Sequence, residues 1–137
     1  MKARAKYTPK KQAKLAYMVL ICFGVFLAGG KGYGVFLGNF YIFTDEITSH
    51  ISNFSISLLF YLLIGYSLLK GGVKFHNIAI LGLTILAANF ICETLMAFMN
   101  TTDILDALYG SVGTILGFVF LLIVDKYGLQ KDDTVIE

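Results

Sequence analysis

Four long, mostly apolar segments constrain this chain more than any other feature of its sequence. They lie at about residues 15–34, 51–69, 77–99 and 103–124. An α-helix needs about 20 mostly apolar residues to cross a bilayer, and each segment is close to that length. Apolar residues follow one another continuously instead of alternating with polar ones, which argues against a transmembrane β-barrel. We therefore predict an all-α integral membrane protein whose four transmembrane helices form one bundle.

The composition agrees with a membrane protein and excludes several other classes. Apolar residues make up 57% of the chain and charged residues 15%, whereas soluble domains have about 45–50% and about 25%. The mean hydropathy is +0.75. A disordered tail, a nucleic-acid binder and a disulfide-stapled secreted module are all excluded by these values. We expect no nucleic-acid partner.

The positive charges predict the orientation of the bundle. With four spans, residues 1–14, 70–76 and 125–137 lie on one side of the membrane, and they contain every lysine and arginine except Lys31. Cytoplasmic segments of membrane proteins are enriched in these two residue types. Both termini are therefore expected in the cytoplasm, with residues 1–137 forming a single transmembrane domain between a basic N-terminal tail and a polar C-terminal tail.

Two segments outside the predicted spans are expected to lie at the membrane surface. The cations of residues 1–14 should attract anionic lipids of the inner leaflet, although their role in setting the topology explains them by itself. Residues 32–44 are aromatic and uncharged but contain Gly34 and Gly38. Because aromatic rings collect at the headgroup boundary, we predict an interfacial or re-entrant segment on the outer leaflet. A loop packed over the bundle is the alternative.

Polar side chains within the spans are the best indication of a functional site. On the third span Asn89, Glu93 and Asn100 share one face at helical spacing. A carboxylate at membrane depth is costly, so Glu93 must face protein or water. We predict that Glu93 transfers protons or binds a cation, and a protonated structural glutamate is the alternative.

The second and fourth spans carry further polar residues toward the same outer end. Interhelical hydrogen bonding would suffice for Ser57 and Tyr61 on the second span, whereas His50 is a candidate second acid–base group. On the fourth span, capping of the helix explains Asp103 better than Asp106, which lies one turn deeper. The polar stripe of the second span, at steps of three and four residues, consists of His50, Asn53, Ser57 and Tyr61.

If these faces meet, the outer end of the bundle contains an acidic site. An acidic cluster in a low dielectric binds a cation, holds protons or pairs with a cationic headgroup. Whether the protein is an enzyme stays open, and so does a divalent cation, whose ligands would be Glu93, Asp103 and Asp106. The candidate catalytic residues are Glu93, Asp106 and His50, and the candidate binding residues are Asp103, Asn89, Asn100, Asn53, Ser57 and Tyr61.

The run from Glu93 to Gly113, ETLMAFMNTTDILDALYGSVG, resembles the signature between the third and fourth helices of the VanZ-like proteins. These are bacterial membrane proteins associated with teicoplanin resistance. The glutamate, the two acids and the glycine of that signature fall on Glu93, Asp103, Asp106 and Gly113. The segment from Glu46 to His50 resembles the acid-to-histidine segment that leads into the second helix of the family. The sequence departs from the family at three positions, where glutamine, arginine and asparagine are replaced by Met96, Asn100 and Gly110.

The resemblance implies a function at the outer leaflet of a bacterial inner or plasma membrane. The protein would bind or modify a lipid headgroup or a lipid-linked cell-envelope precursor and contribute to glycopeptide tolerance. Two other functions stay open from the residues alone. One is a non-catalytic subunit or scaffold that binds a larger membrane complex, and the other is a small transporter coupled to protons or ions through Glu93.

Overall fold

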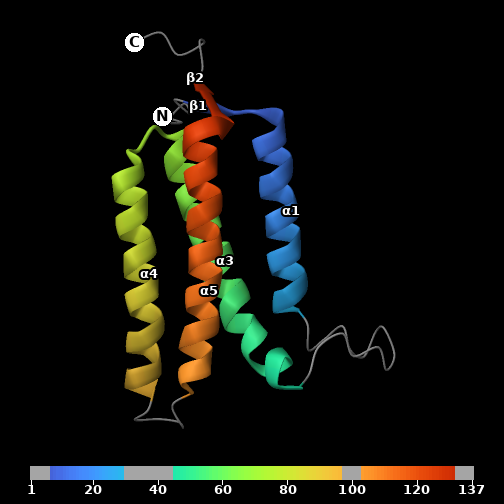
Figure 1. Ribbon diagram of the computed structural model, residues 1–137, viewed down its shortest axis with the longest axis vertical. Helices are drawn as coiled ribbons and strands as arrows, with labels where there is room; N and C mark the ends of the chain where they lie inside the picture. The colour runs from blue at the N-terminus through green and yellow to red at the C-terminus, as the bar shows by residue number, and fades with distance from the viewer. Residues whose placement is uncertain (1–6, 30–44, 97–102, 132–137) are drawn as a thin grey trace, which may run out of the picture.

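A computed structural model describes residues 7–29, 45–96 and 103–131. Its long helices are α1 (Lys11–Ala28), α3 (Asp45–Lys70), α4 (Phe75–Met96) and α5 (Ile104–Ile123). All 4 are long and apolar enough to cross a membrane, and they lie side by side in one bundle (Figure 1). The predicted all-helical bundle with four candidate spans is therefore confirmed, and a multi-pass membrane protein is indicated.

The distribution of apolar side chains is the one that a lipid environment requires. Leu15, Leu83 and Leu95 point outward and are 68%, 65% and 70% exposed. Such outward leucines, one on α1 and two on α4, would be unfavourable in water but cost nothing in lipid.

Two helices begin earlier than the predicted spans, in more polar sequence. Helix α1 begins at Lys11 instead of near residue 15, and α3 begins at Asp45 instead of near residue 51. Polar residues at the membrane surface can continue a helix that apolar residues begin, because each added residue gains a backbone hydrogen bond once the helix is nucleated. The predicted interfacial segment at 32–44 and the predicted binding residue Asn100 lie outside the described residues.

A small two-stranded sheet closes one end of the bundle. Strands β1 (Tyr7–Pro9) and β2 (Leu129–Lys131) pair in antiparallel fashion. The π-helix η1 (Val124–Gly128) links α5 to β2, and the Lys10 amide donates to the Gly128 carbonyl over 2.7 Å. The segments predicted as tails at 1–14 and 125–137 thus contain ordered structure that joins the start of α1 to the end of α5.

Helix α3 is the centre of the bundle. It crosses behind α5 in Figure 1, between α1 and α4, and it packs most extensively against α5. Tyr61 is fully buried, and its hydroxyl donates to the Ile78 carbonyl of α4 over 2.8 Å. This bond is the interhelical role that was left open for Tyr61. The largest fully buried apolar side chains around it are Leu58, Leu62, Leu69, Ile78 and Leu121.

Glycines on α5 allow its close approach to α3. A Cβ atom at Gly113 would overlap the Phe54 carbonyl oxygen of α3, and one at Gly117 would lie 3.0 Å from the Tyr61 ring. Small residues let neighbouring helices in a membrane approach to backbone contact. The seam that these two glycines form positions the first turn of α5 against the start of α3.

Candidate site at the acidic end of the bundle

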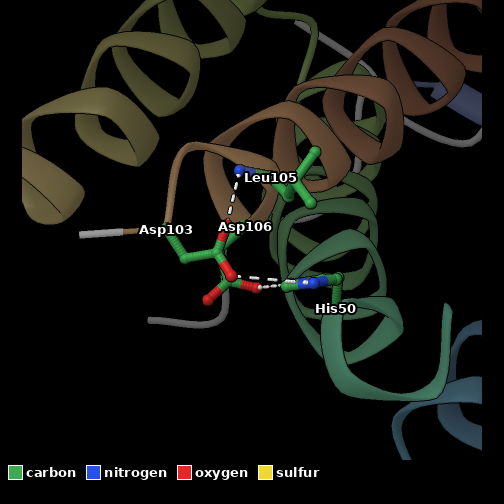
Figure 2. A network of polar contacts seen from close by, with 4 residues as sticks. All are labelled: His50, Asp103, Leu105 and Asp106. Atoms are coloured by element: carbon green, nitrogen blue, oxygen red, sulfur yellow. Dashed lines mark hydrogen bonds and ion pairs between the residues drawn. The ribbon is translucent and has the colours of Figure 1, made fainter. Parts of the chain in front are cut away.

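His50 of α3 and two aspartates of α5 meet at the end of the bundle opposite the β1–β2 sheet. His50 Nδ1 lies 2.7 Å from Asp106 Oδ1, and His50 Nε2 lies 3.6 Å from Asp103 Oδ2 (Figure 2). The histidine is 8% exposed, whereas the aspartate side chains are 46% (Asp103) and 27% (Asp106) exposed. The acidic site therefore has a buried histidine and carboxylates that reach its surface.

The first turn of α5 positions both carboxylates. Asp103 is the N-cap, and its Oδ1 accepts a hydrogen bond from the Leu105 amide over 3.0 Å. Its other oxygen is then left to face His50. The predicted cap at Asp103 is confirmed. Asp106, which capping explained less well, has His50 as its partner instead.

The arrangement suits a group that gains and loses a proton. A protonated imidazole donates from both ring nitrogens, whereas a neutral one donates from only one. A protonated ring would hydrogen-bond Asp106 through Nδ1 and form an ion pair with Asp103 on the side of Nε2. A histidine oriented by a carboxylate is the usual arrangement of a general acid or base.

Tyr109 is a member of this cluster that sequence reasoning did not single out. Its ring packs against His50 with centroids 5.6 Å apart and planes tilted by 37°. Tyr109 follows Asp106 by three residues, so both lie on the α5 face that meets α3. The three-residue spacing from Asp106 could have indicated that Tyr109 faces α3. An aromatic residue in an apolar span is more typical of a surface in contact with lipid, so the sequence alone did not single out Tyr109.

A second polar pair lies deeper between α3 and α4. The Ser57 hydroxyl donates to Asn89 Oδ1 over 3.1 Å. The amide nitrogen of Asn89 is buried without a hydrogen-bond partner among the described residues. A Cβ atom at Gly110 would lie 2.8 Å from that nitrogen. Two of the predicted binding residues are thus in contact, and Asn53 is half-buried on α3 between His50 and Ser57.

Glu93 lies outside the His50 cluster. It is half-buried on α4 and lines a groove of about 410 Å³ together with Phe90, Thr94 and Ile104. Within the described ranges it has no hydrogen-bond or ion-pair partner. Ile104 directly follows Asp103 in the chain, so the groove and the cluster share the start of α5.

The described residues contain no group of three or more histidine, cysteine, aspartate or glutamate side chains that could hold a metal ion. The predicted cation ligands Glu93, Asp103 and Asp106 are not gathered around a common point in this part of the chain. The cluster that does form has one histidine between two carboxylates.

Comparison with known proteins found no protein-family model, curated protein or solved structure that matches this sequence. The VanZ-like resemblance therefore rests on the residues between Glu46 and Gly113 alone.

Asp103 caps α5 and also places a negative charge near His50, and substitution can separate these two effects. We expect Asp103→Ala to lower the free energy of unfolding by about 1 kcal/mol, because the Leu105 amide loses its cap. Asp103→Asn should cost much less, since asparagine is an equally good N-cap. The measurement is unfolding in mixed detergent micelles, followed by circular dichroism. Equal losses for the two variants would show that the charge near His50, and not the cap, stabilises this end.

Proposed function

We propose that this multi-pass membrane protein binds or modifies a lipid headgroup or a lipid-linked cell-envelope precursor at its acidic end. The observation that carries the proposal is His50 held between Asp103 and Asp106. The VanZ-like resemblance supports it from the sequence, with glycopeptide tolerance as the expected phenotype. By the orientation that the lysines predict, this end would face the outer leaflet, and the resemblance implies a bacterial plasma membrane.

The charges of the acidic end favour particular headgroups. Its described residues, which include the ends of α1 and α4 and the starts of α3 and α5, contain no lysine or arginine. Among these described residues a bare phosphate would find carboxylates and no guanidinium partner. Amine or hydroxyl groups of a headgroup or a lipid-linked sugar are better suited, since carboxylates accept hydrogen bonds from both.

The reacting step that this geometry supports is proton transfer. His50 would take a proton from a headgroup hydroxyl or amine, and Asp106 would stabilise the imidazolium that forms. The groove beside Ile104 is lined by apolar side chains on either side of Glu93. It offers room for part of an acyl chain next to the site.

The test is the lipid that the purified protein retains. We expect mass spectrometry of the wild-type protein in mild detergent to find one headgroup class enriched over the membrane extract. His50→Gln should reduce this enrichment by about tenfold, the effect expected for losing one hydrogen bond to a charged group. His76→Gln is the matched control, because His76 is exposed on α4 at the opposite end.

Other outcomes would contradict the proposal. Equal enrichment in wild-type and His50→Gln protein would show that the retained lipid binds elsewhere. If no headgroup class is enriched and a membrane protein co-purifies in stoichiometric amount, the scaffold function replaces this one. Proton uptake by reconstituted vesicles that depends on Glu93 would favour transport.

A further inference from the structure

A pocket of about 440 Å³ lies at the other, lysine-rich end of the bundle, between β1, α1 and α3. Its walls include Lys14 and Tyr17 from the first turns of α1, and Tyr66 and Lys70 from the last turns of α3. Residues from three separate elements meet there because the β1–β2 pair holds the chain before α1 against the bundle. The pocket therefore exists only when these elements are folded together, and the basic N-terminal segment by itself would not form it.

Two lysines of the pocket wall are not neutralised by any described residue. Neither Lys14 nor Lys70 has an ion-pair partner among the described residues. Asp125 is the single acidic residue in the described part of this end. The described residues around the pocket are therefore mainly positive, and they include further lysines at the same end, namely Lys10, Lys11, Lys74, Lys126 and Lys131.

Tyr66 gives an independent indication of a ligand. It is 7% exposed and lines the pocket, yet its buried hydroxyl has no hydrogen-bond partner within the described ranges. Its ring is stacked on Tyr17 with centroids 4.0 Å apart and planes within 8°. Leaving a buried hydroxyl unpaired is costly, and the stacked rings keep Tyr66 from turning toward another partner. A ligand with an acceptor oxygen against this wall of the pocket would give the Tyr66 hydroxyl the hydrogen-bond partner that it lacks among the described residues.

We propose that this pocket binds the phosphate of an anionic phospholipid. The ammonium groups of Lys14 and Lys70 neutralise the phosphate, and the Tyr66 hydroxyl donates to one of its oxygens. Exposed Leu15 and Val19 lie beside the pocket on α1, so the acyl chains have an apolar helix surface to follow. The site is at the opposite end from the His50 cluster and does not depend on the function proposed for that cluster.

The predicted orientation places this pocket beside the leaflet that contains anionic phospholipids. The lysine-rich end faces the cytoplasm by the distribution of positive charge, and the cytoplasmic leaflet contains anionic lipids. A soluble phosphate compound would make the same contacts with the lysines, but it would leave the apolar surface of Leu15 and Val19 uncovered.

The experiment is a titration of the purified full-length chain in neutral detergent, followed by native mass spectrometry. The probes are dioctanoyl phosphatidylglycerol, dioctanoyl phosphatidylcholine and the deacylated headgroup glycerophosphoglycerol. We expect the wild-type protein to bind phosphatidylglycerol in preference to phosphatidylcholine. The double variant Lys14→Gln/Lys70→Gln should bind it at least about tenfold more weakly, and Tyr66→Phe about threefold to tenfold more weakly.

The matched control removes the same charge from the same end but outside the pocket. Lys11→Gln/Lys74→Gln should weaken binding by no more than about twofold, which is the contribution of the general positive potential. An equal loss in both double variants would overturn the pocket in favour of diffuse attraction. Equal affinity for glycerophosphoglycerol and the lipid would overturn the lipid as ligand.

Stability is measured alongside binding. The unfolding temperature of each variant without added lipid shows whether the fold is retained. If the double variant unfolds earlier than the wild type, Lys14→Gln alone is used, because Lys14 is exposed. It should weaken phosphatidylglycerol binding by about threefold to fivefold, and unchanged binding in a folded Lys14→Gln protein would contradict the proposal.

Discussion

Replacing Gly113 by alanine is expected to cost about 3 kcal/mol of stability, near the upper end for an added methyl group in a packed interior. The new Cβ would overlap the Phe54 carbonyl oxygen and lie 3.2 Å from the Leu58 amide nitrogen. Both atoms belong to the backbone of α3, so no side-chain rotation can relieve the overlap. The two helices would have to separate along the most extensive contact in the bundle. The measurement is the free energy of unfolding in mixed detergent micelles.

Two other substitutions on α5 serve as references for the loss of stability expected from Gly113→Ala. Val112 is 57% exposed on the outside of the bundle, so Val112→Ala should change the free energy by no more than about 0.5 kcal/mol. Gly110→Ala should have an intermediate effect, because its Cβ would meet the Asn89 side chain, which can rotate. A Gly113→Ala protein as stable as Val112→Ala would mean that α3 and α5 do not approach at this point.

The parts of the fold that the bilayer constrains, namely the length and the apolar composition of its helices, could be predicted from the sequence. A span must be about 20 residues long and apolar, so the four spans were predictable. The β1–β2 pair was not. Its strands have three residues each, too few to show a periodicity, and they pair the two ends of the described chain.

The charged and titratable residues of the candidate site were predictable from the sequence, but Tyr109 and the contacts between these residues were not. The cost of burying polar groups singled out His50, Glu93 and Asp106, but the bond between His50 and Asp106 joins residues 56 positions apart. Helix α4 is apolar around almost its whole circumference. Its sequence therefore does not indicate which face meets α5, and Glu93 was grouped with side chains that it does not contact in the described structure.

Asp106→Asn is expected to reduce the enrichment of the retained lipid by about tenfold, as much as His50→Gln, while leaving the protein folded. Asparagine keeps the size of the side chain and can still accept a hydrogen bond from His50 through its oxygen. It cannot supply the negative charge that stabilises a protonated imidazole, and charge-assisted hydrogen bonds are roughly twice as strong as neutral ones. Asp125→Asn, an exposed change at the opposite end, should leave the enrichment unchanged.

Three substitutions in the same assay separate the roles of the acidic residues. Asp103→Asn should be milder than Asp106→Asn, because Asp103 lies 3.6 Å from the ring, compared with 2.7 Å for Asp106. Glu93→Gln should change the enrichment by no more than about threefold, since a group outside the network contributes by long-range charge alone. If Glu93→Gln abolishes the enrichment and Asp106→Asn does not, the reacting group lies on α4 in the groove beside Ile104, and the His50 cluster is a structural link between α3 and α5.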